Sequence, residues 1–331
     1  YRQGAALPDT ESVEQGSPPV LERRYAMGKK EKKALAKSRR TRRQAIYGMI
    51  YILPAFLVIM TFCILPIFMT LYYSFTDYNM YSPPVFSGLK NYLAAFQNKT
   101  FYAALVNTCK YVLVTAPAQV VLSLSIAAFI AEKLRNKYGS FMRSVMFIPQ
   151  IVSGIAAASV WKSLFKSDGI LNTVIEVFGG NGLNWLGNKQ LAFICVSIVS
   201  IWKSVGYFLV IYYAGIMGVP MEQHEAAVMD GATAWQRFRH ITLPSVKPIT
   251  YMVITLSVIW SFQTFDIIYQ MTTGGPGTST LTLAYMIYQQ AFANKRMGFA
   301  SALAVILLVL VLLINLIQDV FFKEKEGGKT A

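Results

Sequence analysis

Residues that could do chemistry occur in two places in this largely apolar chain. The first place is a pair of apolar segments in which polar and aromatic side chains recur at helical spacing. The earlier face carries Ser200, Lys203, Ser204 and Tyr207, and the later one carries Ser257, Trp260, Ser261 and Thr264, at i, i+3, i+4 and i+7. Hydroxyl, amine and aromatic groups in this pattern suit the binding of a polar solute. Serine hydroxyls also hydrogen-bond between helices, at about 0.6 kcal/mol each, and for any one serine that alternative stays open.

The second place is a polar stretch, Glu225-Ala-Ala-Val-Met-Asp-Gly231, which nine residues separate from Ile241-Thr-Leu-Pro244. Pro220 can begin a helix there, and Gly231 can supply the left-handed residue that ends it. Acidic residues at positions 222 and 225 suit the positive end of that helix.

A second short helix is expected directly after Gly231. Thr233 can cap its start, and we expect Pro244 to end it. Two short helices that meet at a glycine, with small side chains at Ala226 and Ala227, make a compact knob that another protein could grip. The alternative is a helical hairpin that packs against the rest of its own chain.

Reaction chemistry has little support in the sequence. The only two histidines, His224 and His240, both lie within residues 218–247, and the apolar segments hold no cluster of acidic residues. The phosphate-binding pattern G-x-x-x-x-G-K-[ST] is absent, and Gly328-Lys329-Thr330 lacks its first glycine. We therefore expect no catalytic site, no metal site and no enzyme activity.

Composition indicates an integral membrane protein. Of the 331 residues, 54% are hydrophobic and only 14% are charged, which is too apolar for an ordinary soluble domain. The net charge of +15 could suggest nucleic acid, but nine basic residues crowd between Lys29 and Arg43, directly before the first apolar run. Lys and Arg accumulate in this way on the cytoplasmic side of a membrane, so we expect no nucleic-acid partner.

Apolar runs predict an all-α protein with six transmembrane helices. They cover about residues 46–75, 102–131, 141–165, 191–217, 248–271 and 297–322. The polar stretch then falls in a loop at 218–247, between the fourth and fifth helices. The termini and the loops on the same side of the membrane as residues 218–247 hold more Lys and Arg than the loops on the other side. This bias places both termini and the loop 218–247 in the cytoplasm.

The ends of the chain are expected to be tails outside the membrane domain at 46–322. Residues 1–45 are expected to form a cytoplasmic tail, in which the polar residues 1–26 are disordered. The basic segment 29–43 is expected to be a solvated tail, and a short helix on anionic headgroups is the alternative. Met27 resembles a natural start, so residues 1–26 are interpreted as an added extension, and a native origin stays open. Residues 323–331 are expected to form a short cytoplasmic tail.

The loop 218–247 resembles the cytoplasmic signature loop of bacterial ABC-importer permeases. Its pattern is Glu-Ala-Ala, three residues, Gly, nine residues, Ile, one residue and Leu-Pro, and every fixed position matches. In that family the loop is a coupling helix that sits in a cleft of a separate ATPase. The resemblance assigns this role to Glu225, Ala226, Ala227, Asp230, Gly231, Ile241, Leu243 and Pro244.

A narrower resemblance is to permeases for oligosaccharides and related polyols, the maltose-type group. It rests on Phe265-Asp-Ile-Ile-Tyr269, Thr272-Thr-Gly-Gly-Pro276 and Gly88-Leu-Lys-Asn-Tyr92. The residues that it places on the substrate pathway are Ser200, Ser204, Tyr207, Ser257, Trp260 and Ser261. We expect this chain to lack the extra N-terminal spans and large external domain of the longer maltose permease subunit.

The resemblance implies a permease subunit that forms half of a sugar pathway in a bacterial cytoplasmic (inner) membrane. Implied partners are a second homologous permease, two cytoplasmic ATPase subunits that bind ATP and Mg, an extracytoplasmic solute-binding protein, and lipid. The chain itself is expected to bind no cofactor. An ion-coupled secondary transporter is the alternative, and it would need broken helices or titratable groups at mid-membrane, which the spans do not clearly show.

Overall fold

The computed structural model describes residue 44 and residues 47–327. Apart from residue 44, the expected tail at 1–45 lies outside the described residues, as do residues 328–331. The chain divides into two units, residues 1–67 and 68–331. The described part of the first unit is helical, within a segment, Tyr47–Ser74, that is long and apolar enough to cross a membrane.

That first segment contains a widened turn. A π-helical turn, η1 (Met60–Ile64), is followed by α2 (Leu65–Ser74). Pro66 has no N–H to donate to the carbonyl four residues earlier, and its ring crowds that carbonyl. The wider turn directly before the proline accommodates this gap without ending the helix.

The second unit supplies the other membrane-length helices. Four segments within its described residues qualify by length and composition: α4 (Lys99–Lys133), α8 (Lys189–Met217), α12 (Lys247–Phe262) together with α13 (Asp266–Met271), and the part of α15 (Met297–Gly327) up to Val320. A bent pair, α5 (Lys137–Ile151) and α6 (Gly154–Leu164), completes six if it is one span. This agrees with the predicted all-α architecture.

The expectation of one continuous helix at 141–165 is wrong. The axes of α5 and α6 differ by 98°, and the chain between them, Val152 and Ser153, is extended. A carboxylate oxygen of Asp266 lies where a β-carbon of Gly154 would be. Because only glycine leaves this room, the contact between α13 and the start of α6 favours a new helix at this point.

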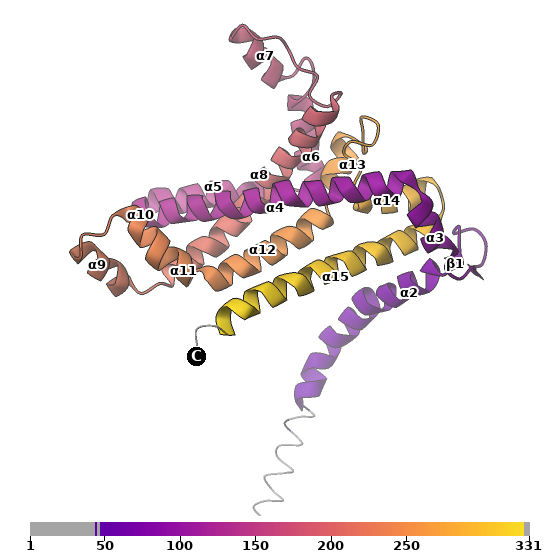
Figure 1. Ribbon diagram of the computed structural model, residues 1–331, viewed down its shortest axis with the longest axis horizontal. Helices are drawn as coiled ribbons and strands as arrows, with labels where there is room; N and C mark the ends of the chain where they lie inside the picture. Colours follow the sequence, from indigo (N-terminus) through magenta and orange to yellow (C-terminus); the bar gives the residue numbers. More distant parts are fainter. Residues whose placement is uncertain (1–43, 45–46, 328–331) are drawn as a thin grey trace, which may run out of the picture. The chain divides into compact units, whose positions relative to one another are not determined.

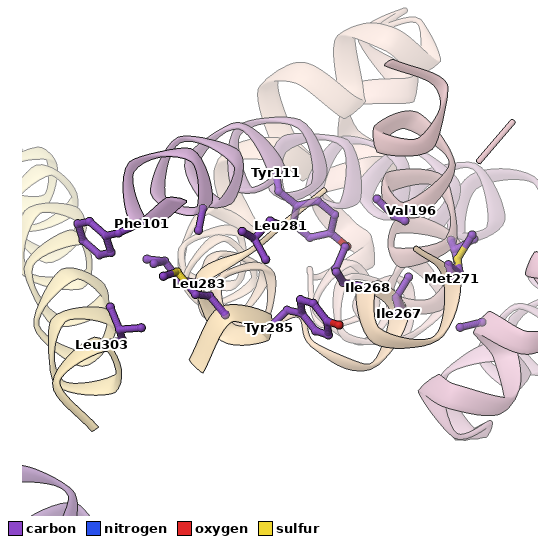
Figure 2. Packing of buried hydrophobic residues seen from close by; sticks show 14 of the residues in the cluster. Phe101, Tyr111, Val196, Ile267, Ile268, Met271, Leu281, Leu283, Tyr285 and Leu303 are labelled. Carbon is purple, nitrogen blue, oxygen red and sulfur yellow. The ribbon is translucent and has the colours of Figure 1, made fainter. Parts of the chain in front are cut away.

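Packing of α4 against α8 and α12 forms the centre of the second unit, and these helices run alongside one another in Figure 1. One buried cluster joins them through Ile130, Phe208, Leu209, Tyr212 and Val253. Another, shown in Figure 2, lies around α13 and α14 (Leu283–Tyr288) and includes Phe101, Tyr111, Ile268 and Leu303. These clusters fix α4, α8, α12 and α13 relative to one another.

Short elements gather at the two ends of this bundle (Figure 1). One end carries the strands β1 (Thr76–Asp77) and β2 (Val85–Phe86), α3 (Lys90–Gln97) and the turn η3 (Gln289–Ala293) beside α14. The other end carries α9 (Met221–Met229), α10 (Ala234–Arg237), η2 (Phe238–Thr242) and α11 (Leu243–Ser245). A further helix, α7 (Ile170–Val177), follows α6. The loop 218–247 therefore lies at the end opposite to α14.

Candidate functional site

The first helix of the loop 218–247 has the predicted form. Pro220 precedes α9, and Gly231 follows it with a φ of 77°. The Ala232 N–H donates to the Ala227 carbonyl at 2.8 Å, and the Gly231 N–H donates to the Val228 carbonyl at 3.0 Å. This pair of bonds is the Schellman motif, which needs a left-handed residue at the position that Gly231 occupies.

The second helix begins as predicted but ends later. The Thr233 hydroxyl accepts from the Gln236 N–H at 3.3 Å, and the Gln236 side chain accepts from the Thr233 N–H at 2.7 Å, so a capping box opens α10. The prediction that Pro244 ends the helix is wrong. The helix continues through the π turn η2 and then α11 to Ser245. A widened turn accommodates Pro244, which has no N–H to donate to the preceding turn.

Most of the eight signature residues of this loop are open to contact. The exposed ones are Glu225, Ala226, Asp230, Gly231, Leu243 and Pro244, while Ala227 and Ile241 are half-buried. Ala227, Asp230, Gly231 and Ile241 line a surface hollow of about 400 Å³. Apolar side chains are exposed beside it, and Met229 is 87% exposed. Exposed apolar patches can mark interaction sites, so these side chains are candidates for contact with another protein.

A polar cavity of about 200 Å³ lies between the helices of the bundle. Its walls come from α4, α8, the ends of α5 and α12, the start of α13, and the break between α12 and α13. The lining residues are Gln119, Gln150, Ser200, Lys203, Ser204, Trp260, Ser261, Gln263, Thr264, Asp266 and Ile267. This set combines amide, hydroxyl and charged groups with one large aromatic ring. It can therefore donate and accept hydrogen bonds to a hydroxylated solute and cover one of its apolar faces.

The structure brings four of the six predicted pathway residues to this cavity: Ser200, Ser204, Trp260 and Ser261. Tyr207 lies outside the lining, with its ring centroid 5.0 Å from that of Trp260. Ser257 is fully buried and donates a hydrogen bond to Gln119 Oε1 at 2.7 Å, so it joins α12 to α4. A transport role for these six residues stays a prediction.

Three glutamines of the lining were missed by sequence reasoning. Gln119 and Gln150 lie on spans that showed no polar stripe, and Gln263 lies in the break after α12. A lone glutamine in an apolar helix was the only available signal. Gln119 is 1% exposed, and an amide buried to this degree requires hydrogen-bond partners.

The structure shows helix breaks that the sequence did not clearly show. The breaks at 152–153 and 263–265 both border the polar cavity, next to Gln150 and Asp266. Asp266 begins α13, and its Oδ1 accepts from the Ile267 N–H at 3.0 Å. Helix N-termini favour negative charge, which suits a carboxylate at this position. Broken helices alone therefore do not separate an ABC permease from a secondary transporter.

Comparison with known proteins separates these classes. Residues 91–326 match the family described as "Binding-protein-dependent transport system inner membrane component". The chain belongs to this family. It is thus the permease component, rather than a catalytic component, of a binding-protein-dependent ABC importer, and its place is the inner membrane.

Relatives agree over most of their length. The probable ABC transporter permease protein YurN of Bacillus subtilis is 35% identical over 278 residues, covering 83% of this chain and 95% of the relative. The trehalose/maltose transport system permease protein MalF of Thermococcus litoralis is 32% identical over 272 residues, covering 82% and 91%. The lactose transport system permease protein LacF of Rhizobium radiobacter is 30% identical over 288 residues, covering 85% and 95%.

Solved structures show the same fold. A bacterial ABC transporter that imports the acidic polysaccharide alginate matches with a TM-score of 0.72 and 21% identity, covering 86% of this chain and 96% of the other. The alginate transporter in complex with its pentasaccharide-bound periplasmic protein matches with a TM-score of 0.74 and 21% identity, covering 84% and 93%. The ABC permease fold is therefore that of this chain.

Proposed function

We propose that this permease forms half of a translocation pathway for a sugar or oligosaccharide, which an extracytoplasmic solute-binding protein delivers. The observation that carries the proposal is the polar cavity. Serine hydroxyls, glutamine amides and Trp260 line one cavity. Hydrogen-bonding groups beside an aromatic face match the chemistry of a sugar ring, which has hydroxyls at its edge and an apolar face.

The position of the cavity supports a pathway through the membrane. Lys203 lies midway along α8 and is about 21 Å from either end of that helix, at 1.5 Å per residue. An ammonium group in hydrocarbon at this depth would cost at least about 2.5 kcal/mol. Facing a polar cavity removes much of that cost. The lining therefore supplies a polar environment for this ammonium group midway along α8.

The energy for transport comes, in this proposal, from separate ATPase subunits that bind ATP and Mg. The loop 218–247 receives their motion through its eight signature residues, most of which are exposed. One such loop serves one ATPase, so a second, homologous permease chain completes the pore and serves the other. The loop 218–247 and both termini lie in the cytoplasm, as the distribution of Lys and Arg indicates.

Transport by the complete assembly tests this function. The permease, its partner chains and the cognate solute-binding protein would be reconstituted in proteoliposomes with a panel of radiolabelled di- and trisaccharides. We expect uptake of at least one sugar that requires both ATP and the binding protein. Uptake driven by a proton or sodium gradient without ATP would contradict the proposal, and so would failure to take up any sugar with a binding protein that binds it.

Replacing Trp260 with alanine tests the cavity itself. The change removes the only large aromatic face of the lining, so we expect uptake to fall by about tenfold, equivalent to about 1.4 kcal/mol of lost interaction. Trp202→Ala is the matched control, because Trp202 lies on the same helix as Lys203, contacts Trp161, and does not line the cavity. Equal uptake by both variants would contradict a role of the cavity in transport.

A further inference from the structure

An ion pair joins the loop 218–247 to the inner end of α4. Arg237 Nη2, on α10, pairs with Glu132 Oε1, in the last turn of α4. The same guanidinium donates through Nη1 to the Ala232 carbonyl at 2.8 Å, in the link between α9 and α10. Arg237 therefore holds the segment after α9 and the end of α4 at the same time.

The start of α9 has its own contact with this region. Arg135, just after α4, donates from Nη1 to Met221 Sδ at 3.0 Å, and its Nε donates to the Ala131 carbonyl at 2.7 Å. Arg135 and Arg237 thus hold the chain on either side of α9. We call Glu132, Arg135 and Arg237 the α4 clamp.

The α4 clamp matters because α9 has no packed core of its own. No residue of α9 or α10 is buried. Phe238, directly after α10, packs partly against the cluster around Ala131 and Ile216. Trp235 of α10 contacts Phe238, with ring centroids 5.5 Å apart. Because α9 has no buried residue, the side-chain hydrogen bonds of Arg135 and Arg237 are important for holding the chain at its two ends.

The helix α4 extends from the α4 clamp to the polar cavity. α4 is one continuous helix from Lys99 to Lys133, and it packs along α8 and α12. Gln119 on this helix lines the cavity and accepts a hydrogen bond from Ser257 of α12. The distance along α4 from Glu132 to Gln119 is about 20 Å. A displacement of the end of α4 therefore reaches the cavity wall through a single rigid element.

We propose that the Glu132–Arg237 ion pair transmits movement of α9 to α4 and so to the polar cavity. Both residues are positioning residues, and they act through the helices that they join. This inference rests on the proposed function, in which an ATPase holds and moves α9. It adds a defined mechanical link between that contact and the substrate pathway.

The burial of the pair distinguishes it from an ordinary surface contact. The side chains of Arg237 and Glu132 are 15% and 33% exposed. In contrast, the other ion pair in the described part of the chain, Lys90–Asp77, has side chains that are 72% and 70% exposed. Exposed ion pairs contribute little, because water and salt screen them. Lys90–Asp77 joins α3 to β1 at the opposite end, and it therefore serves as a matched control.

The experiment measures the response of the cavity to nucleotide in the complete transporter, co-purified with its partner chains. Gln263, an exposed residue of the lining, is replaced by cysteine in a background where Cys63, Cys109 and Cys195 are alanine. The rate at which a membrane-impermeant maleimide labels this cysteine is measured with and without a non-hydrolysable ATP analogue. Labelling of this chain alone is read from its shift in mass on a gel.

We expect nucleotide to change the labelling rate in the parent protein by about fivefold or more, the usual lower range of allosteric coupling. Glu132→Gln and Arg237→Gln should each reduce that change to about twofold or less, while the ATPase chain still co-purifies. The double variant should respond no less than Arg237→Gln, because both changes break the same contact. Lys90→Gln should retain the parent response.

Three results would overturn the proposal. One is an undiminished nucleotide response in both single variants. Another is loss of the ATPase chain from either variant, which would mean that the pair shapes the docking surface rather than transmitting motion. The third is an additive loss in the double variant. Failure of the proposed function has a different signature, because the parent protein would then lack an ATPase partner or any response to nucleotide.

Discussion

Gly231→Val is expected to uncouple this permease from its ATPase while leaving the membrane helices folded. Gly231 has a φ of 77°, and a β-branched residue in this conformation costs roughly 1–2 kcal/mol. No described atom lies within 4 Å of the position where a β-carbon would be, so the change meets no steric clash within the described chain. The strain instead breaks the Schellman motif and changes the direction in which the chain leaves α9.

Two quantities are measured: ATP-driven uptake, and the amount of ATPase chain retained in the purified complex. We expect at least one of them to fall about tenfold or more. Gly179→Val is the control, because Gly179 has a φ of 82° and equally open surroundings but follows α7, far along the chain from the loop 218–247. It carries the same backbone penalty and should retain the ATPase. Normal uptake and ATPase retention in Gly231→Val would show that the shape of this loop is unimportant.

Gly206→Leu is expected to have the largest effect on folding. A β-carbon on Gly206 of α8 would lie 1.7 Å from the Met146 carbonyl oxygen of α5 and 3.0 Å from the Phe147 α-carbon. Both are backbone atoms, so no side-chain rotation can relieve the overlap. The two helices must separate, and overpacking of this kind costs about 3 kcal/mol or more.

Thermal stability in detergent measures this cost, as the temperature at which half of the protein loses its monodisperse peak. We expect Gly206→Leu to lower it by about 6 °C or more, or to abolish folded protein. Gly206→Ala should fall between this variant and the parent. Gly48→Leu is the control, since no described atom lies within 4 Å of its β-carbon position. Equal stability of the Gly206 and Gly48 variants would contradict the close approach of α5 and α8.

Local signals were sufficient to predict the helices of the loop 218–247. Pro220, Gly231 and Thr233 affect the backbone only within a few residues, so the sequence is sufficient to predict their effect. Pro244 was misread for the same reason. A proline usually ends a helix because it has no N–H to donate. Here the π turn at Phe238–Thr242 accommodates the proline, and no local sequence signal distinguishes the two outcomes.

Contacts between distant segments could not be predicted. At the break before Gly154, the glycine lies against the Asp266 carboxylate, which is more than a hundred residues later in the chain. The Glu132–Arg237 pair likewise joins residues that are 105 positions apart. Polar stripes on α8 and α12 identified two walls of the cavity, whereas Gln119 and Gln150 became part of it only through the packing of α4 and α5. Helical periodicity reports one face of one helix and cannot report its neighbour.

Site-specific photo-crosslinking tests the coupling role of α9 most directly. The photoreactive residue p-benzoylphenylalanine would replace Met229, which is 87% exposed on α9, or Val177, which is 77% exposed on α7. In the complete transporter we predict that irradiation joins position 229 to an ATP-binding chain and that position 177 gives no such product. Absence of this product at position 229 in an assembled, ATP-hydrolysing complex would contradict the central claim that this loop is where the ATPase docks.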